Sequence, residues 1–275
     1  MNPSTILEQH PVRLAELGGD VRVGYRESGA AGAVTHVLLH GIGSGSGSWA
    51  FQLHAAAQAQ GLRALAWDAP GYGQSTPLEG EAPDADAYAA RLWQWLDALD
   101  AKAPVVLVGH SLGCIMAARA ALRQPSRVQR LVLLSPARGY GQAPQAEREE
   151  KLTRRLGMLQ RLGPAGMARE RGAAMLSPSA DEALVAAVRE TMSQVHVHGY
   201  TQATRLLDQS HLIGDVPQLT MPVQVASGSA DTITPAAACQ AVAQAAGQAW
   251  QDLGPVGHAC PLEAASAVNA LLGLT

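Results

Sequence analysis

The chain of 275 residues is predicted to form an α/β fold, with a mostly parallel eight-stranded sheet flanked by helices and a helical cap inserted after strand 6. Two observations carry this prediction. Short apolar runs of strand length alternate with helical segments along most of the chain. The runs at 37–39 and 105–108 contain only apolar residues, which is typical of strands buried on both faces of a parallel sheet.

The elements follow in a regular order. A hairpin is expected first, with strands at 12–17 and 21–26 joined by a Gly-Gly-Asp turn. Further strands are expected near 36–40, 63–67, 105–109, 129–134, 222–227 and 249–253. Helices are expected near 49–60, 86–100, 111–123, 236–246 and 260–272. The core should therefore comprise residues 1–138 and 218–275.

Residues 139–217 break this alternation and are predicted to form the cap. The segment is helical and polar, and its first part places arginines among leucines. These arginines are interpreted as the solvated face of an amphipathic helix. Helices at such a position are expected to cover a pocket, exclude water and set specificity.

Composition favours a compact enzyme with a small-molecule partner. With 47% hydrophobic and 16% charged residues, the chain can bury one sizeable core. A formal net charge of -3 and the lack of a basic stripe argue against nucleic acid as a partner. The sequence leaves the oligomeric state open.

The cellular location of the protein and its need for a metal or cofactor are predicted from patterns that the sequence lacks. Residues 1–8 show no signal-peptide pattern and no apolar run reaches about 18 residues, so a cytoplasmic protein without a membrane partner is expected. The three cysteines lack paired or metal-like spacing and are interpreted as buried free thiols. His196 and His198 have no third partner at metal-ligand spacing. Neither a metal nor a cofactor is expected.

The strongest chemical signal is the pentapeptide Gly-His-Ser-Leu-Gly at 109–113. It follows a buried strand and opens a helix, the context in which Gly-x-Ser-x-Gly presents a nucleophilic serine on a sharp turn. Ser111 is therefore the predicted nucleophile. A serine hydroxyl needs a nearby base, and His258 is the predicted base. Asp231 is predicted to orient the imidazole and compensate its charge.

Two backbone amides are predicted to bind the oxyanion of the tetrahedral intermediate. Leu112 lies at the start of the helix after Ser111, where amides lack helical acceptors. Ile42 lies in the loop after the strand at 36–39 and is the second expected donor. His40, in the same loop, is expected to order the loop rather than to act as a second base.

These motifs resemble those of α/β-hydrolase fold enzymes of the esterase and lactonase group, and the likeness extends over nearly the whole chain. The Ser, Asp, His order agrees with that fold. The resemblance also rests on the His-Gly loop at 40–49, the Asp-Ala-Pro-Gly-Tyr-Gly-Gln-Ser stretch at 68–75 and the segment 258–263. Within the group, the stretches at 135–138 and 171–207 are most similar to 3-oxoadipate enol-lactonases.

The resemblance implies a serine hydrolase that cleaves a carboxylic ester or lactone through an acyl-enzyme. An enol-lactone substrate would carry a free carboxylate, for which Arg138 is the candidate partner. Trp49 and His40 are the other residues expected at the substrate site. Ser111 excludes relatives of this fold that use an aspartate nucleophile.

Other functions stay open at this point. Carbon-carbon bond hydrolases that act on ring-cleavage dienoates share the triad, but they usually carry a Trp soon after the histidine, where this chain has Cys260 and Pro261. A non-enzymatic ligand-binding protein, a perhydrolase or an acyltransferase would have the same motif. Residues 45–50 also match a loose dinucleotide-binding pattern, with Asp68 about twenty residues on. That pattern would leave the three triad residues unexplained.

Overall fold

The computed structural model describes residues 2–275, and Met1 lies outside the described residues. Its centre is an eight-stranded sheet with the strand order β1-β2-β4-β3-β5-β6-β7-β8. The strands are β1 Arg13–Glu16, β2 Arg22–Gly29, β3 His36–Leu39, β4 Arg63–Trp67, β5 Val105–His110, β6 Val128–Leu134, β7 Val223–Ser227 and β8 Trp250–Asp252. β2 pairs antiparallel with β1 and β4, and all other pairs are parallel. The predicted fold class is confirmed.

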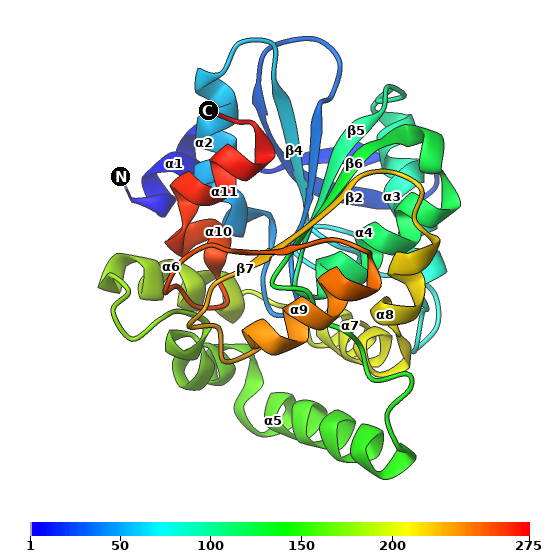
Figure 1. The fold of residues 1–275 in the computed structure, drawn as a ribbon, viewed down its shortest axis with the longest axis vertical. Helices are drawn as coiled ribbons and strands as arrows, with labels where there is room; N and C mark the ends of the chain where they lie inside the picture. Colours follow the sequence, from blue (N-terminus) through cyan, green and yellow to red (C-terminus); the bar gives the residue numbers. More distant parts are fainter. Residues whose placement is uncertain (1) are drawn as a thin grey trace.

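Helices cover both faces of the sheet (Figure 1). The helices are α1 Pro3–Gln9, α2 Ala50–Gln58, α3 Ala85–Ala98, α4 Leu112–Arg123, α5 Gln145–Arg171, α6 Glu182–Ser193, α7 Val197–Gln209, α8 Leu212–Asp215, α9 Ala236–Ala245, α10 Cys260–Glu263 and α11 Ala265–Leu272. None of the helices within residues 2–275 has the length and apolarity needed to cross a bilayer.

Alternate residues of the central strands build two separate cores. Val37, Leu39 and Leu107 join the larger core with side chains of α3, α4 and α9. Leu38 and Val108 join the other core with side chains of α2 and α11. Since side chains along a strand point alternately to opposite faces, a strand covered on both faces must be apolar at every position. This explains the continuous apolar runs in the sequence.

The helices differ from the prediction in three respects, besides shifts of one or two residues at their ends. Helix α1 was not expected, although Asn2 caps it by accepting the Ser4 N–H at 3.0 Å and Pro3 occupies its first turn. The expected helix at 260–272 is divided at Ala264 into α10 and α11. The expected helix at 49–60 is preceded by a 3₁₀ turn over Ser46–Trp49.

The segment between β6 and β7 contains α5 to α8, as the break in alternation predicted. In Figure 1 the long helix α5 lies at the bottom of the molecule, below α9 and α7. Helix α5 is kinked, because Gly163 adopts φ 61° and ψ 177° and Pro164 follows. The short helix α8 contacts α4 and α9, so this last part of the segment packs onto the core.

Candidate active site

Ser111 occupies a strained turn between β5 and α4. Its backbone has φ 54° and ψ -117°, a conformation that side-chain-bearing residues rarely adopt. The Ser111 N–H donates to the Leu134 carbonyl of β6 at 2.9 Å, and its carbonyl accepts the Ala137 N–H at 3.2 Å. The turn is therefore held by the neighbouring strand, and the side chain is lifted to the sheet edge.

The two glycines of the pentapeptide are required by close backbone approach. A Cβ at Gly113 would lie 2.3 Å from the Leu39 carbonyl oxygen of β3. A Cβ at Gly109 would lie 2.5 Å from the Gly113 carbonyl oxygen. Both distances are far shorter than a carbon-oxygen contact allows, so only glycine lets α4 start this close to the sheet.

His258 and Asp231 form a buried pair beside this turn. The His258 Nδ1 donates to Asp231 Oδ2 at 2.9 Å, and the two residues are 4% and 3% exposed. Asp231 Oδ1 also accepts the amides of Ile233 at 2.8 Å and Thr234 at 2.9 Å. Burial alone would raise the pKa of Asp231, but the hydrogen bonds from His258 and Thr234 and the charge on His258 outweigh burial and lower it to about 2. The Asp231 carboxylate is therefore ionised at neutral pH.

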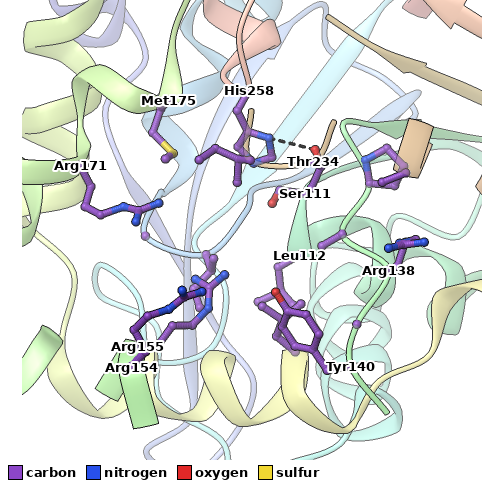
Figure 2. A pocket seen from close by; sticks show the side chains of 18 of the residues that line it. Ser111, Leu112, Arg138, Tyr140, Arg154, Arg155, Arg171, Met175, Thr234 and His258 are labelled. Atoms are coloured by element: carbon purple, nitrogen blue, oxygen red, sulfur yellow. Dashed lines mark hydrogen bonds between the residues drawn. The ribbon is translucent and has the colours of Figure 1, made fainter. Parts of the chain in front are cut away.

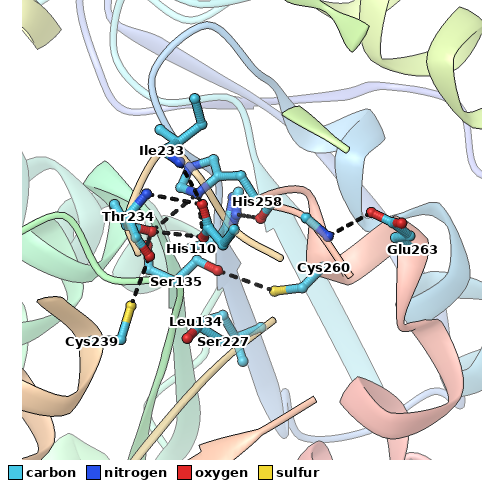
Figure 3. Close-up of polar contacts among 12 residues, drawn as sticks. His110, Leu134, Ser135, Ser227, Ile233, Thr234, Cys239, His258, Cys260 and Glu263 are labelled. Carbon is cyan, nitrogen blue, oxygen red and sulfur yellow. Dashed lines mark hydrogen bonds and ion pairs between the residues drawn. The ribbon is translucent and has the colours of Figure 1, made fainter. Parts of the chain in front are cut away.

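Thr234 is a site residue that the sequence reasoning missed. Its hydroxyl lies 2.8 Å from Asp231 Oδ2 and 3.1 Å from both the Ser135 carbonyl oxygen and His258 Nδ1 (Figures 2 and 3). A hydroxyl can donate and accept at once, so it can bridge the acid and the imidazole. The Asp-x-x-Thr spacing, typical of a turn closed by an aspartate, was the available signal.

His110 holds the His258 backbone through a hydrogen bond. Its Nε2–H donates to the His258 carbonyl at 2.8 Å, and the two rings lie 4.9 Å apart (Figure 3). Burial, with the nearby His258, lowers the pKa of His110 to about 3. His110 therefore stays neutral and holds the loop that carries His258.

A cavity of about 410 Å³ opens at Ser111 and His258 (Figure 2). Met175 and Met192 line both this cavity and a small adjoining pocket at the same two residues. Among residues 2–275, no hydrogen bond joins Ser111 Oγ to the His258 ring, although both side chains line the cavity. Bonds between a nucleophile and its base commonly tighten only when substrate binds.

Two backbone amides are available where an oxyanion would form. Ile42 and Leu112 both line the cavity, and neither amide donates to another group of residues 2–275. A Cβ at Gly41 would lie 2.8 Å from Ser111 Cβ, so the loop of Ile42 lies directly against the serine. The arrangement can bind a negatively charged oxygen at Ser111.

Two residues expected at the substrate site lie outside these cavities. Trp49 is fully buried in the core with Leu38 and Leu53. His40 Nε2 accepts the Ala69 N–H at 2.9 Å, and its Nδ1–H donates to the Gly41 carbonyl at 2.8 Å. Both ring nitrogens are therefore used in ordering the loop. The prediction that Trp49 and His40 contact substrate is corrected, because neither side chain reaches the cavity.

The segment 45–50 contains buried residues and residues that line a second cavity at Asp68. It forms a 3₁₀ turn, and the Ser46 N–H donates to Asp68 Oδ1 at 2.7 Å. Asp68 thus satisfies a backbone donor, as its position in a turn suggested.

Arginines form one side of the cavity. Arg138 lines it, and its role in binding a carboxylate stays a prediction. Arg154, Arg155 and Arg171 of α5 line it too. Arg154 is exposed and Arg155 is half-buried, so the helix face interpreted as solvated also borders the cavity. Helical periodicity could not reveal this, because it does not say which face of α5 meets the cavity.

Glu263 joins the cavity wall to the His258 loop. Its carboxylate accepts the Gly257 N–H at 2.8 Å and the Ser177 N–H at 2.9 Å, and it also accepts the Ser177 hydroxyl. The Ala259 N–H donates to the Met175 carbonyl at 2.7 Å. The residues on both sides of His258 are therefore fixed to the segment that carries Met175.

The cysteines lie in the protein interior. Cys114, Cys239 and Cys260 are buried and free. Burial raises the pKa of the Cys260 thiol to about 12, so this thiol stays protonated. This agrees with the interpretation of the cysteines as small buried residues.

A family profile described as the alpha/beta hydrolase fold matches residues 37–265. The acetyltransferase component of the acetoin cleaving system (dihydrolipoyllysine-residue acetyltransferase) of Cupriavidus necator is 31% identical over 272 residues, covering 94% of this chain and 67% of that protein. A 2-hydroxy-6-oxononadienedioate/2-hydroxy-6-oxononatrienedioate hydrolase of Paraburkholderia xenovorans is 36% identical over 130 residues, covering 46% of this chain and only 44% of that protein. The enol-lactonase from Burkholderia xenovorans LB400 superposes with a TM-score of 0.81 at 21% identity over 96% of this chain and 99% of that chain, a likeness of fold.

Proposed function

Because this chain belongs to the alpha/beta hydrolase fold family, we propose that it is a serine hydrolase that cleaves a carboxylic ester or lactone through an acyl-enzyme intermediate. The observation that carries the proposal is the buried His258–Asp231 pair, whose imidazole lines the same cavity as Ser111, Ile42 and Leu112. These are the groups that acyl transfer requires: a nucleophile, an oriented base and donors for an oxyanion.

The proposed reaction has two halves. Ser111 Oγ attacks the carbonyl carbon while its proton passes to His258 Nε2, and the amides of Ile42 and Leu112 bind the oxyanion. The bond to the leaving oxygen then breaks, and His258 returns the proton to that oxygen. Water attacks the acyl-enzyme, gives its proton to His258, and the acid leaves as Ser111 regains its proton. Asp231 stays ionised and stabilises the imidazolium in both halves.

Residues 139–217 are proposed to form a lid over this site. Helix α5 supplies Met158, Met167 and three arginines to the cavity wall, so the segment can select substrates and exclude water. Arg138 is proposed to bind a substrate carboxylate through its planar guanidinium. Replacement of Arg138 by Ala should raise KM for an anionic ester and spare a neutral one.

Carbon-carbon bond hydrolysis is the second candidate, because the relative from Paraburkholderia xenovorans is named as a hydrolase of a dienedioate. The same triad would serve it. Cys260 and Pro261 follow His258 in the place where such enzymes usually carry Trp, which favours the ester or lactone reaction.

The deciding experiment is turnover of short esters, enol-lactones and dienoates by the wild-type protein and by Ser111→Ala. We expect ester or lactone turnover by the wild-type protein and a loss of nearly all activity in the variant, with labelling of Ser111 by a fluorophosphonate. Preferred turnover of dienoates would replace the ester reaction by the carbon-carbon reaction. A wild-type protein that binds such compounds without turning any over would be a ligand-binding protein.

The proposed substrate is a small molecule, and a cytoplasmic location is part of the proposal. The three free cysteines support it, because disulfides are rare in reducing compartments.

A further inference from the structure

Three arginines of one helix converge on the cavity at Ser111. Figure 2 shows the side chains of Arg154, Arg155 and Arg171 extending from α5 toward the space beneath Ser111 and His258. Arg138 lies on the other side of the same cavity. Four guanidinium groups therefore line a space of about 410 Å³.

These arginines differ from the paired arginines elsewhere in the fold. Arg148, one to two turns earlier on α5, forms a two-bond pair with Asp208 at 2.8 and 3.2 Å. Arg119 also pairs with Asp215, because its Nη2 lies 2.8 and 3.1 Å from the two carboxylate oxygens. Among residues 2–275, no carboxylate lies within 4 Å of the guanidinium nitrogens of Arg154, Arg155 or Arg171. Their five donors each are free to bind a ligand.

The kink in α5 brings the three arginines together. Arg154 and Arg155 precede the break at Gly163, and Arg171 ends the helix after it. The left-handed φ of 61° at Gly163 turns the second half of α5, so that both halves face one cavity. A straight helix of this length would separate residues 154 and 171 by roughly 25 Å along its axis.

The charge balance of the cavity calls for an anion. A guanidinium stays protonated at any ordinary pH, so the four groups repel one another. Glu147 is the only acidic residue of the described chain that lines the cavity. Two or more negative charges on a ligand would restore the balance, and the fork of each arginine matches a carboxylate or a phosphate.

We infer that the substrate of this site carries at least two negative charges and that Arg154, Arg155 and Arg171 bind them. This inference rests on the proposed hydrolase function and specifies its substrate class. Met158, Met175 and Met192 line the same cavity, so it also offers apolar surface to the part of the substrate that joins the anionic groups to the reacting bond. The arginines are specificity-determining residues and do not touch the reacting atoms.

The test is calorimetric binding of product-like anions at constant ionic strength, which needs no turnover. Hexanoate, adipate and tricarballylate carry one, two and three carboxylates, and 3-phosphonopropanoate tests a phosphorus oxyanion. We expect Kd to fall at least about tenfold from hexanoate to adipate or tricarballylate. Tighter binding of the phosphonate than of adipate would identify a phosphate-bearing substrate, and the reverse order a polycarboxylate.

Arg154→Ala, Arg155→Ala and Arg171→Ala should each weaken adipate and tricarballylate about tenfold or more, with hexanoate changed less than about threefold. Arg161→Ala is the matched control, because Arg161 lies exposed on the same helix and does not line the cavity. Thermal melting of each variant verifies folding, and Arg→Lys variants should recover part of the affinity.

Equal binding of hexanoate and tricarballylate, or equal losses in Arg161→Ala and the cavity variants, would overturn the inference. The hydrolase function is tested separately with 4-nitrophenyl acetate, which carries no charge on its acyl group. Anion binding without hydrolysis of any ester would remove the proposed function and leave the anion site in place. Hydrolysis without preference for anions would support the proposed function and remove the anion site.

Discussion

At the scale of single residues, the hydroxyl of Thr234 connects the carboxylate and the imidazole of the proposed triad. It lies within 3.1 Å of both Asp231 and His258, and its own position is held by the Ser135 carbonyl. Thr234 is therefore a positioning residue: it acts on the imidazole and the carboxylate and not on the substrate.

Replacement of Thr234 by Val keeps the shape of the side chain and removes the hydroxyl. We expect kcat to fall about tenfold to a hundredfold with little change in KM, because one hydrogen bond to a charged, buried carboxylate is lost. The pH profile of kcat should also shift, since the Thr234 hydroxyl, together with His258 and the Thr234 amide, lowers the pKa of Asp231. Thr234→Ser should recover most of the activity. A Val variant with wild-type kcat and pH profile would argue against this role.

His110 should make folding stability depend on pH. Its pKa is about 3 in the folded protein, against an ordinary value of 6.5, so the unfolded chain binds a proton first as the pH falls. The stabilising contribution of neutral His110 is complete above pH 6.5 and is lost as the pH falls toward 3. We expect the slope of unfolding free energy against pH in this range to decrease by about 1.4 kcal/mol per pH unit in His110→Gln.

Urea unfolding at pH 6.5, 5.5 and 4.5 measures that slope. His198→Gln serves as the control, because His198 is exposed on α7 and its replacement should leave the slope unchanged. An unchanged slope in His110→Gln would show that His110 is not the group responsible.

At the scale of elements, the junction of β3, β5 and α4 depends on glycine. The pairing of Leu39 with Gly109 places the ends of β3 and β5 side by side, and Gly113 starts α4 against the Leu39 carbonyl. Gly41, in the loop after β3, packs directly against Ser111. The loop of Ile42 and the serine therefore meet because two strands far apart in the chain are neighbours.

Gly113→Ala should lower the free energy of unfolding by about 3 kcal/mol or more, because the added Cβ would overlap backbone atoms that cannot move independently. Gly157→Ala is the matched control on the exposed part of α5, where a Cβ meets no other atom within 4 Å. This control should raise stability by about 0.5–1 kcal/mol, since alanine loses less conformational entropy in a helix. Chemical denaturation of both variants measures the difference, and similar effects would refute the packing argument.

The elements also show which local signals can be read from a sequence. The strands were predicted within one to three residues of their observed ends, because continuous apolar runs bounded by polar turns are a strong pattern. Helix α1 was missed although an Asn-Pro start was present. The division of the last helix at Ala264 had no signal, because the residues on both sides are good helix formers.

At the scale of the whole molecule, Glu263 connects the inserted segment to the core. Its carboxylate accepts hydrogen bonds from the N–H groups of Gly257, next to His258, and of Ser177, two residues after Met175. A Cβ at Gly257 would lie 2.4 Å from the Leu176 carbonyl carbon, so the two segments are in direct backbone contact. The segment at residues 175–177 and the loop of His258 are therefore joined by both side-chain and backbone contacts.

Glu263→Ala should loosen this connection without unfolding the sheet. The amides of Gly257 and Ser177 would lose their acceptor, so we expect their hydrogen exchange to increase about tenfold or more while exchange in β5 stays the same. The value of kcat should fall with it, because the His258 loop gains freedom. Glu170→Ala, an exposed position on α5, should change neither quantity. Unchanged exchange at Gly257 and Ser177 would contradict the proposed connection.

The sequence by itself determined the fold class, most strand positions and the three residues proposed to carry the reaction. These are local properties: apolar runs, the Gly-x-Ser-x-Gly turn and the order of Ser111, Asp231 and His258 are all readable along the chain. Only the tertiary structure decided that β4 lies between β2 and β3, that Thr234 and Glu263 join the site, and that the arginines of α5 face the cavity. Each of these depends on contacts between segments far apart in sequence, and local patterns carry no information about which distant segment a side chain will meet.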